Sequence, residues 1–295
     1  MRLEKEDLDE PLFESAPLAH AAARTLCRSD GDAGTGCAWY HGAWQYFRAL
    51  GIVTAPTVHA RGLTEALCAL ARGGSHSRVL VSGAADYSLL AHVLHAYRCE
   101  GARIEPTVVD VCETPCYLSR WYAERLAAGV STVAADILEH RAESPYDVVC
   151  THGFFGNFDS EGRRLLVERW HALLRPGGRV VTVQRIRPDD DNPFVVFSAE
   201  QAAAFRDTVL ERATAQAARL DQTPEYLAAL AFTYAQRVRS HPVRSADELQ
   251  RSFEEQGFAL ERFERVVARQ AAGPQIRGPA LPSGAEHLEI VAVRR

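Results

Sequence analysis

The chain contains 295 residues, of which 47% are hydrophobic and 24% charged, a balance that is ordinary for a soluble globular protein. Its formal net charge of −5 argues against a protein that binds the phosphate backbone of nucleic acids. No apolar run approaches the length of a membrane span, so we expect no membrane partner.

Residues 1–70 precede the first predicted strand. A loop rich in Gly, Asp and Ser at 29–36 is expected to be mobile. An aromatic stretch with helical spacing follows, in which we expect Trp44 and Phe47 to pack into a core. Tyr40 and His41 follow Trp39 directly, and three adjacent side chains cannot all face one way on a helix. At least one of them should point away from the core.

The first strand ends in a turn suited to a ligand. Val79–Val81 form a short apolar run typical of a buried parallel strand. Gly83 then permits a tight turn and a close approach of the backbone to a ligand. A nucleotide site in a doubly wound sheet is built in this way. Asp86 is expected to cap the helix that follows, over residues 89–97.

The next two predicted strands also end in acids. The strand over 104–110 ends in Asp110, and a carboxylate at the carboxyl end of a strand can accept both hydroxyls of a ribose. Thr114 with Pro115 predicts the start of a helix that runs through residue 126. A third strand over 130–135 leads into Asp136.

Two further strands complete the core pattern. The fourth, over 146–151, leads into the loop His152–Phe158, whose three phenylalanines can form either an aromatic wall or part of the core. A helix then ends near the segment Leu173–Gly178, and a fifth strand covers residues 179–184.

Residues 187–244 interrupt the sheet pattern with helices. A polar loop at 187–193 precedes a capping box made by Ser198 and Gln201. Thr223 before Pro224 predicts a second helix, and Ser245 caps a third. This insertion either covers a substrate, thickens the domain, or forms a contact in a homodimer.

The seven cysteines are scattered through these elements. The charged segment 1–7 is unlike a signal peptide, so we expect a cytoplasmic protein with free thiols. Cys112 and Cys116 lie close together, but no further ligands at metal spacing accompany them. The sequence therefore predicts structural thiols and no metal.

The ordered set of strand ends at Gly83, Asp110 and Asp136 resembles the class I S-adenosylmethionine-dependent methyltransferases. The segment 174–181 (LRPGGRVV) and the tail 245–295 strengthen this resemblance, because the tail is similar to the last helix and closing antiparallel strand pair of that family. The resemblance implies an α/β, Rossmann-like, doubly wound and mostly parallel seven-stranded sheet. Residues 71–295 would form the core, residues 1–70 a helical N-terminal lid, and residues 187–244 a substrate-covering insertion.

The resemblance also implies a site for S-adenosyl-L-methionine, with S-adenosyl-L-homocysteine as the product. Gly83 and its neighbours would face the methionine part, Asp110 would hold the ribose, and Asp136 would bind the adenine amino group. Ile137 would lie against the adenine ring. The expected cofactor contacts are Gly83, Ala84, Asp86, Asp110, Asp136, Ile137, Thr151 and His152.

Methyl transfer needs orientation and, for some acceptors, a base. His152 is the first candidate base because it directly follows the fourth strand. His41 is the second candidate and His241 the third. Tyr40 is expected to line the same site. The catalytic set predicted from the sequence is therefore His152, His41 and Tyr40.

The favoured function is a methyltransferase acting on a small-molecule acceptor of secondary metabolism. No Asn-Pro-Pro-Tyr-type sequence follows the fourth strand, which disfavours nucleic acid as the substrate. One alternative uses S-adenosylmethionine for intramolecular cyclisation to azetidine-2-carboxylate, with release of methylthioadenosine. Another is a cofactor-binding module without catalysis. A nicotinamide-dependent dehydrogenase fits the closing segments poorly.

Overall fold

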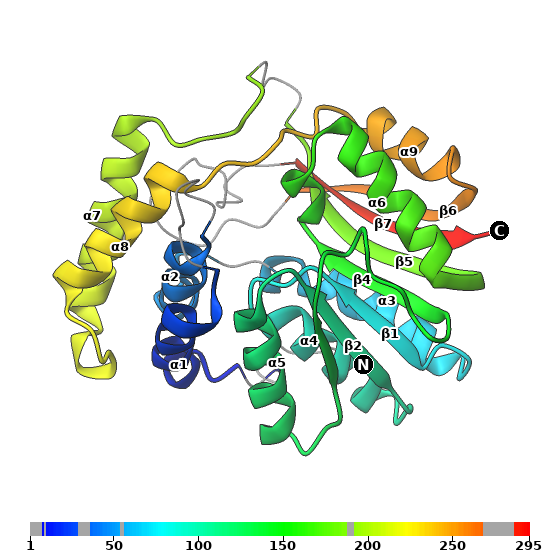
Figure 1. The fold of residues 1–295 in the computed structure, drawn as a ribbon, viewed down its shortest axis with the longest axis horizontal. Coiled ribbons are helices and arrows are strands. Elements are labelled where there is room, and N and C mark those ends of the chain that lie inside the picture. Colours follow the sequence, from blue (N-terminus) through cyan, green and yellow to red (C-terminus); the bar gives the residue numbers. More distant parts are fainter. Residues whose placement is uncertain (1–7, 9, 29–35, 54–55, 188–191, 268–285) are drawn as a thin grey trace.

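The structure is a computed structural model that describes residues 8, 10–28, 36–53, 56–187, 192–267 and 286–295. Its centre is a seven-stranded sheet with the order β3-β2-β1-β4-β5-β7-β6 (Figure 1). Neighbouring strands are parallel, except that β7 runs antiparallel to both β5 and β6. The predicted fold is thereby confirmed. The strands are β1 (Arg78–Ser82), β2 (Glu105–Asp110), β3 (Ser131–Ala134), β4 (Tyr146–His152), β5 (Leu174–Arg185), β6 (Phe258–Val267) and β7 (Glu286–Arg294).

Helices cover both faces of the sheet, which explains why the central strands are apolar on both sides. Val79 and Val81 of β1 belong to one hydrophobic core, whereas Leu80 between them belongs to the other. The helices of the first face are α3 (Ala60–Arg72), α4 (Ser88–Cys99) and α5 (Glu113–Arg125), and those of the second are α6 (Ser160–Leu173) and α9 (Ala246–Glu254).

A third core joins two segments that are far apart in the sequence. Phe47 of α2 packs edge-to-face against Phe205 of α7 and Tyr234 of α8, with ring centroids 5.2 Å apart in both pairs. Figure 1 shows the four helices together as a layer beside the sheet. The predicted lid and insertion therefore share one hydrophobic core. The layer consists of α1 (Leu12–Leu26), α2 (Ala38–Ala49), α7 (Ala199–Ala215) and α8 (Pro224–Arg237).

Most of the predicted helix starts are confirmed. Ser198 and Gln201 form a complete capping box at α7, and the side chains of Thr223 and Ser245 cap α8 and α9. The predicted start of α5 at Thr114 is wrong, because Cys112 is the N-cap and its Sγ accepts a hydrogen bond from the Thr114 backbone N–H.

Two predicted loops fall largely outside the described residues, namely 29–35 of the first and 188–191 of the second. Within the part of the chain that the structure describes, no helix is long and apolar enough to cross a membrane.

Candidate active site

The turn after β1 has the backbone conformation that the sequence predicts. Gly83 has a φ of +73°, in the left-handed region that glycine adopts without strain. The next residue, Ala84, donates its backbone N–H to Asp110 Oδ2 at 2.9 Å. A side chain at position 83 would overlap the ring of Phe154, which covers this turn from the loop after β4. The turn is thus fixed to β2 on one side and shielded on the other.

Asp110 ends β2 with both carboxylate oxygens held by backbone groups. Oδ2 accepts from Ala84 N–H, and Oδ1 accepts from Cys112 N–H at 2.8 Å. Burial raises the pKa of this carboxyl, whereas the two backbone hydrogen bonds oppose that change. Each oxygen of a carboxylate has a second lone pair, so the group can still accept ribose hydroxyls.

Both carboxylate oxygens of Asp86 have partners within the protein. Its Oδ2 lies 3.1 Å from Arg48 Nη1, and its Oδ1 accepts from Ser88 N–H at 2.6 Å. Arg48 also pairs with Glu10 at 2.7 Å, and both side chains of the Arg48–Asp86 pair are at least 98% buried. This pair fastens α2 to the loop after β1, so the contacts seen for Asp86 are structural. The predicted cap is displaced by one residue, because the N-cap of α4 is Tyr87.

The predicted adenine contacts differ in exposure. Asp136 is exposed, and its Oδ1 accepts a hydrogen bond from the backbone N–H of Leu138 at 2.9 Å. Ile137 is only 4% exposed and packs in the core between the sheet and α6. Asp136 is therefore available to a ligand, while Ile137 offers little free surface.

Thr151 joins the ends of β1 and β4. Its hydroxyl donates to the Ser82 carbonyl at 2.7 Å, and the residue is fully buried. The Ser82 hydroxyl accepts from Trp170 Nε1 at 3.0 Å. Thr151 thus positions the strand end from which the Gly83 turn departs, and its hydroxyl proton is already used.

His152 is the last residue of β4 and lies against buried histidines rather than alone in a loop. Its ring centroid is 5.3 Å from that of His59, and His59 is 4.4 Å from His287. Burial lowers the pKa of His152 well below its usual range, with further lowering by the neighbouring His59, His287 and His92. Its Nε2 is buried without a hydrogen-bond partner among the described residues. The ring is therefore neutral at physiological pH.

Tyr40 and His41 diverge, as adjacent residues on a helix must. Tyr40 stacks on Trp44 and on Tyr234, with centroids 5.1 and 5.8 Å apart, and burial raises its pKa. His41 is 93% buried and points instead to a cluster of thiols that includes Cys112. Tyr40 thus belongs to the aromatic layer between α2 and α8, near the Asp110 charge.

The thiol cluster was missed by the sequence argument. Cys27, Cys37, His41 and Cys112 place their ligand atoms within 4.8 Å of one another. The sequence shows no further ligands at metal spacing near Cys112, because its companions come from the N-terminal segment and meet it only through tertiary packing. The neighbouring Cys116 is fully buried and does not belong to the cluster.

The aromatic loop after β4 divides between core and site. Phe155 is fully buried in the core with α6 and α9. Phe154 and Phe158 are only partly buried and meet edge-to-face at 5.2 Å. His241 donates its backbone N–H to the Gly156 carbonyl at 2.7 Å, so the segment after α8 is anchored to this loop.

No protein-family model matches the sequence, and no curated protein is significantly similar to it. Similar solved structures include magnesium protoporphyrin IX methyltransferase from Synechocystis PCC 6803 with bound S-adenosylhomocysteine (11% identity, 81% of this chain and 84% of that chain, TM-score 0.47). Another is 1,6-didemethyltoxoflavin-N1-methyltransferase from Burkholderia thailandensis (19% identity, 79% and 78%, TM-score 0.47). A third is the N-methyltransferase NodS from Bradyrhizobium japonicum (14% identity, 85% and 99%, TM-score 0.46). With its parallel strands and, among the described residues, one reversed strand, β7, the chain has the fold of the class I S-adenosylmethionine-dependent methyltransferases.

Proposed function

We propose that the protein is an S-adenosylmethionine-dependent methyltransferase that acts on a small-molecule acceptor. The observation that carries the proposal is the Asp110 carboxylate at the carboxyl end of β2, held by two backbone N–H groups beside the left-handed turn at Gly83. Ligands of doubly wound sheets bind at this edge.

The residues present fit such a cofactor. Asp110 would accept the ribose hydroxyls, and the exposed carboxylate of Asp136 would accept the adenine amino group. Phe154 and Phe158 would line the side of the site above Gly83, where aromatic faces favour a cation. When bound, the cofactor would supply an electrophilic methyl group. The chain would supply the orientation of the acceptor and the exclusion of water.

Calorimetric titration with S-adenosylhomocysteine tests the cofactor site. Asp110→Asn should weaken binding by about ten- to a hundredfold, because a hydrogen bond to a charged group is typically worth ~1.5–3 kcal/mol. Asp207→Asn is the matched control, since Asp207 is an exposed carboxylate on α7. Equal affinity of a folded Asp110→Asn variant and the control would exclude Asp110 from the site.

We further propose that α1, α2, α7 and α8 cover the acceptor. Support comes from the shared core of these helices and from the attachment of α2 to the loop after β1 through Arg48 and Asp86. Hydrogen exchange of these helices should slow when S-adenosylhomocysteine is bound. Identical exchange with and without ligand, in protein that calorimetry shows to be saturated, would refute the covering role.

His152 is proposed as the base where the acceptor carries a proton to be removed. Its neutral ring and its Nε2 without a partner among the described residues support this role. Replacing it by Ala should lower the single-turnover rate by ~10²–10⁴-fold with little change in cofactor affinity. His140→Gln is the control, because His140 bonds to Tyr146 away from this group. Near-normal single-turnover rates for both His152→Ala and His152→Gln would exclude a base.

The cyclisation to azetidine-2-carboxylate has no contact in its favour among the described residues, and we do not propose it. The nucleoside product separates the two reactions. Methyl transfer releases S-adenosylhomocysteine, whereas cyclisation releases methylthioadenosine.

A further inference from the structure

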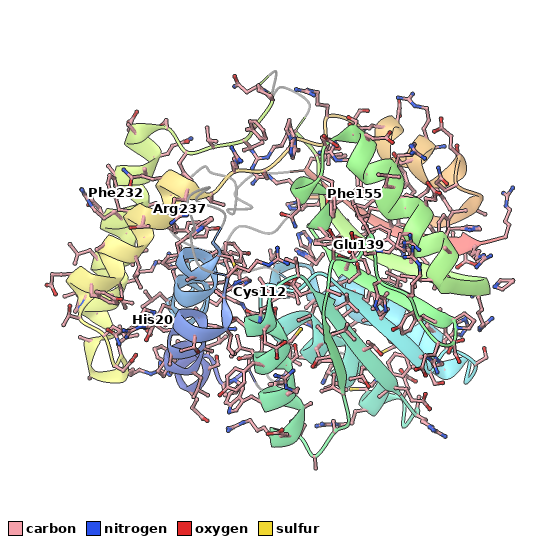
Figure 2. The ribbon with its side chains drawn as sticks, viewed as in Figure 1. His20, Cys112, Glu139, Phe155, Phe232 and Arg237 are labelled. Carbon is pink, nitrogen blue, oxygen red and sulfur yellow. The ribbon has the colours of Figure 1, made fainter. Side chains whose placement is uncertain are left out.

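Three cysteines and one histidine meet where the helical layer touches the sheet. Cys27 follows α1, Cys37 is the N-cap of α2, and Cys112 is the N-cap of α5. His41 stands four residues after Cys37, one helical turn along the same face of α2. Figure 2 shows Cys112 between α2 and the sheet.

The three cysteines of this cluster are free thiols in the structure, and the distances between the four side chains fit a metal. Cys112 Sγ lies 3.5 Å from both Cys27 Sγ and Cys37 Sγ, and His41 Nδ1 lies 3.4 Å from Cys27 Sγ. A disulfide would bring two sulfurs to about 2.05 Å. Zinc–sulfur bonds of about 2.3 Å and zinc–nitrogen bonds of about 2.0–2.1 Å at tetrahedral angles place neighbouring ligand atoms roughly 3.5–3.8 Å apart.

We propose that Cys27, Cys37, His41 and Cys112 bind one zinc ion. Three thiolates and one imidazole in a tetrahedral arrangement are a ligand set that selects zinc over harder cations such as Mg²⁺ and Ca²⁺. Since all four positions are filled by protein, the site is closed to a water or a substrate, as in structural zinc sites. The zinc therefore holds the fold rather than taking part in a reaction.

The surroundings suit anionic sulfur. Thr114 Oγ1 lies 3.1 Å from Cys27 Sγ, where the hydroxyl can donate to a thiolate. The Thr114 backbone N–H donates to Cys112 Sγ at 3.4 Å. Cys112 also caps the N-terminus of α5, where the helix dipole favours a negative charge. Hydrogen bonds of this kind orient the ligands of metal sites.

The zinc would link the helical layer to the strand end beside the proposed ribose site. Cys27 and Cys37 flank the connection between α1 and α2, while Cys112 lies 85 positions after Cys27. The backbone N–H of Cys112 donates to Asp110 Oδ1 at 2.8 Å. A metal at Cys112 thus fixes the loop that positions Asp110. The metal site itself does not depend on the proposed activity.

Metal analysis of the purified full-length chain tests the proposal. The protein is prepared with reductant, without a histidine tag, and its metals are measured by plasma mass spectrometry after exhaustive dialysis. We expect about one zinc per chain, as for a single four-ligand site. Cys37→Ser and Cys112→Ser should lose most of the metal. Cys99→Ser should keep it, because Cys99 ends α4 outside the cluster.

Cobalt substitution gives a second readout that does not require the variants to fold. Wild-type protein stripped of zinc and loaded with Co²⁺ should show thiolate-to-cobalt charge transfer and the intense visible bands of tetrahedral coordination. The proposal would be overturned if the purified protein contained less than about a tenth of an equivalent of zinc and the cobalt-loaded protein showed no such bands. It would also be overturned if Cys37→Ser and Cys112→Ser contained as much zinc as the wild type. A Cys27–Cys112 disulfide found by peptide mapping of the freshly reduced, metal-exposed protein would also overturn it.

Discussion

The buried ion pair between Arg48 and Asp86 should dominate the attachment of the helical layer. Both side chains are almost completely removed from water, and Arg48 also contacts Glu10 at 2.7 Å. Removing one partner of a buried pair leaves a charge without compensation, which typically costs ~3–5 kcal/mol. In Asp86→Ala, Arg48 keeps its contact with Glu10, so we expect a loss near the lower limit, about 3 kcal/mol.

Urea unfolding followed by tryptophan fluorescence measures this loss, since Trp44 and Trp39 lie in the same layer. A double-mutant cycle with Arg48→Met separates the interaction energy of the Arg48–Asp86 pair from the effects of the individual side chains. The Arg61–Glu65 pair, which is exposed on α3, is the control. Its removal by Glu65→Ala should change the unfolding free energy little. Exposed ion pairs contribute up to ~1 kcal/mol. If Asp86→Ala lowers the unfolding free energy by less than that, the Arg48–Asp86 pair does not fasten the helical layer.

Three further outcomes follow from the site. Gly83→Ala should lower the melting temperature, because a left-handed backbone costs ~1–2 kcal/mol for residues other than glycine. It should also weaken S-adenosylhomocysteine binding in calorimetry, because the new methyl group displaces Phe154. Thr151→Val should cost ~1–3 kcal/mol in urea unfolding by leaving the Ser82 carbonyl without its donor, with Thr151→Ser as the control that retains it. Burial lowers the pKa of His92 to about 3, so only the unfolded chain binds this proton between about pH 6.5 and 3. Stability should therefore fall with decreasing pH in that window, by up to ~1.4 kcal/mol per pH unit from this group, and His92→Gln should make the slope of unfolding free energy against pH shallower.

The sheet and its strand ends could be predicted because their signals are local. Apolar runs that stop at Gly83, Asp110 and Asp136 place those residues at one edge of a parallel sheet without any knowledge of packing. The helix starts at Ser198 and Thr223 were equally local, since a cap depends on three or four neighbouring residues.

What was missed depends on contacts between distant segments. The engagement of Asp86 by Arg48 and the meeting of Cys27 with Cys112 arise from packing of the helical layer, and neither pair has a fixed spacing in the chain. The start of α5 was misplaced for a different, local reason. Thr114-Pro115 has the local pattern of a helix start. The helix begins earlier because Cys112, two residues before Thr114, is the N-cap and its sulfur accepts the Thr114 N–H.

The shared core of α1, α2, α7 and α8 has a consequence for biosynthesis. The apolar face of α2 emerges from the ribosome long before Phe205 and Tyr234, its packing partners in α7 and α8. At ordinary elongation rates this interval is on the order of ten seconds. During that time the nascent N-terminal helices display an aromatic surface without its native cover. A chain truncated before α7 would keep that surface exposed permanently, so premature termination should yield aggregates or chaperone substrates rather than a smaller functional domain.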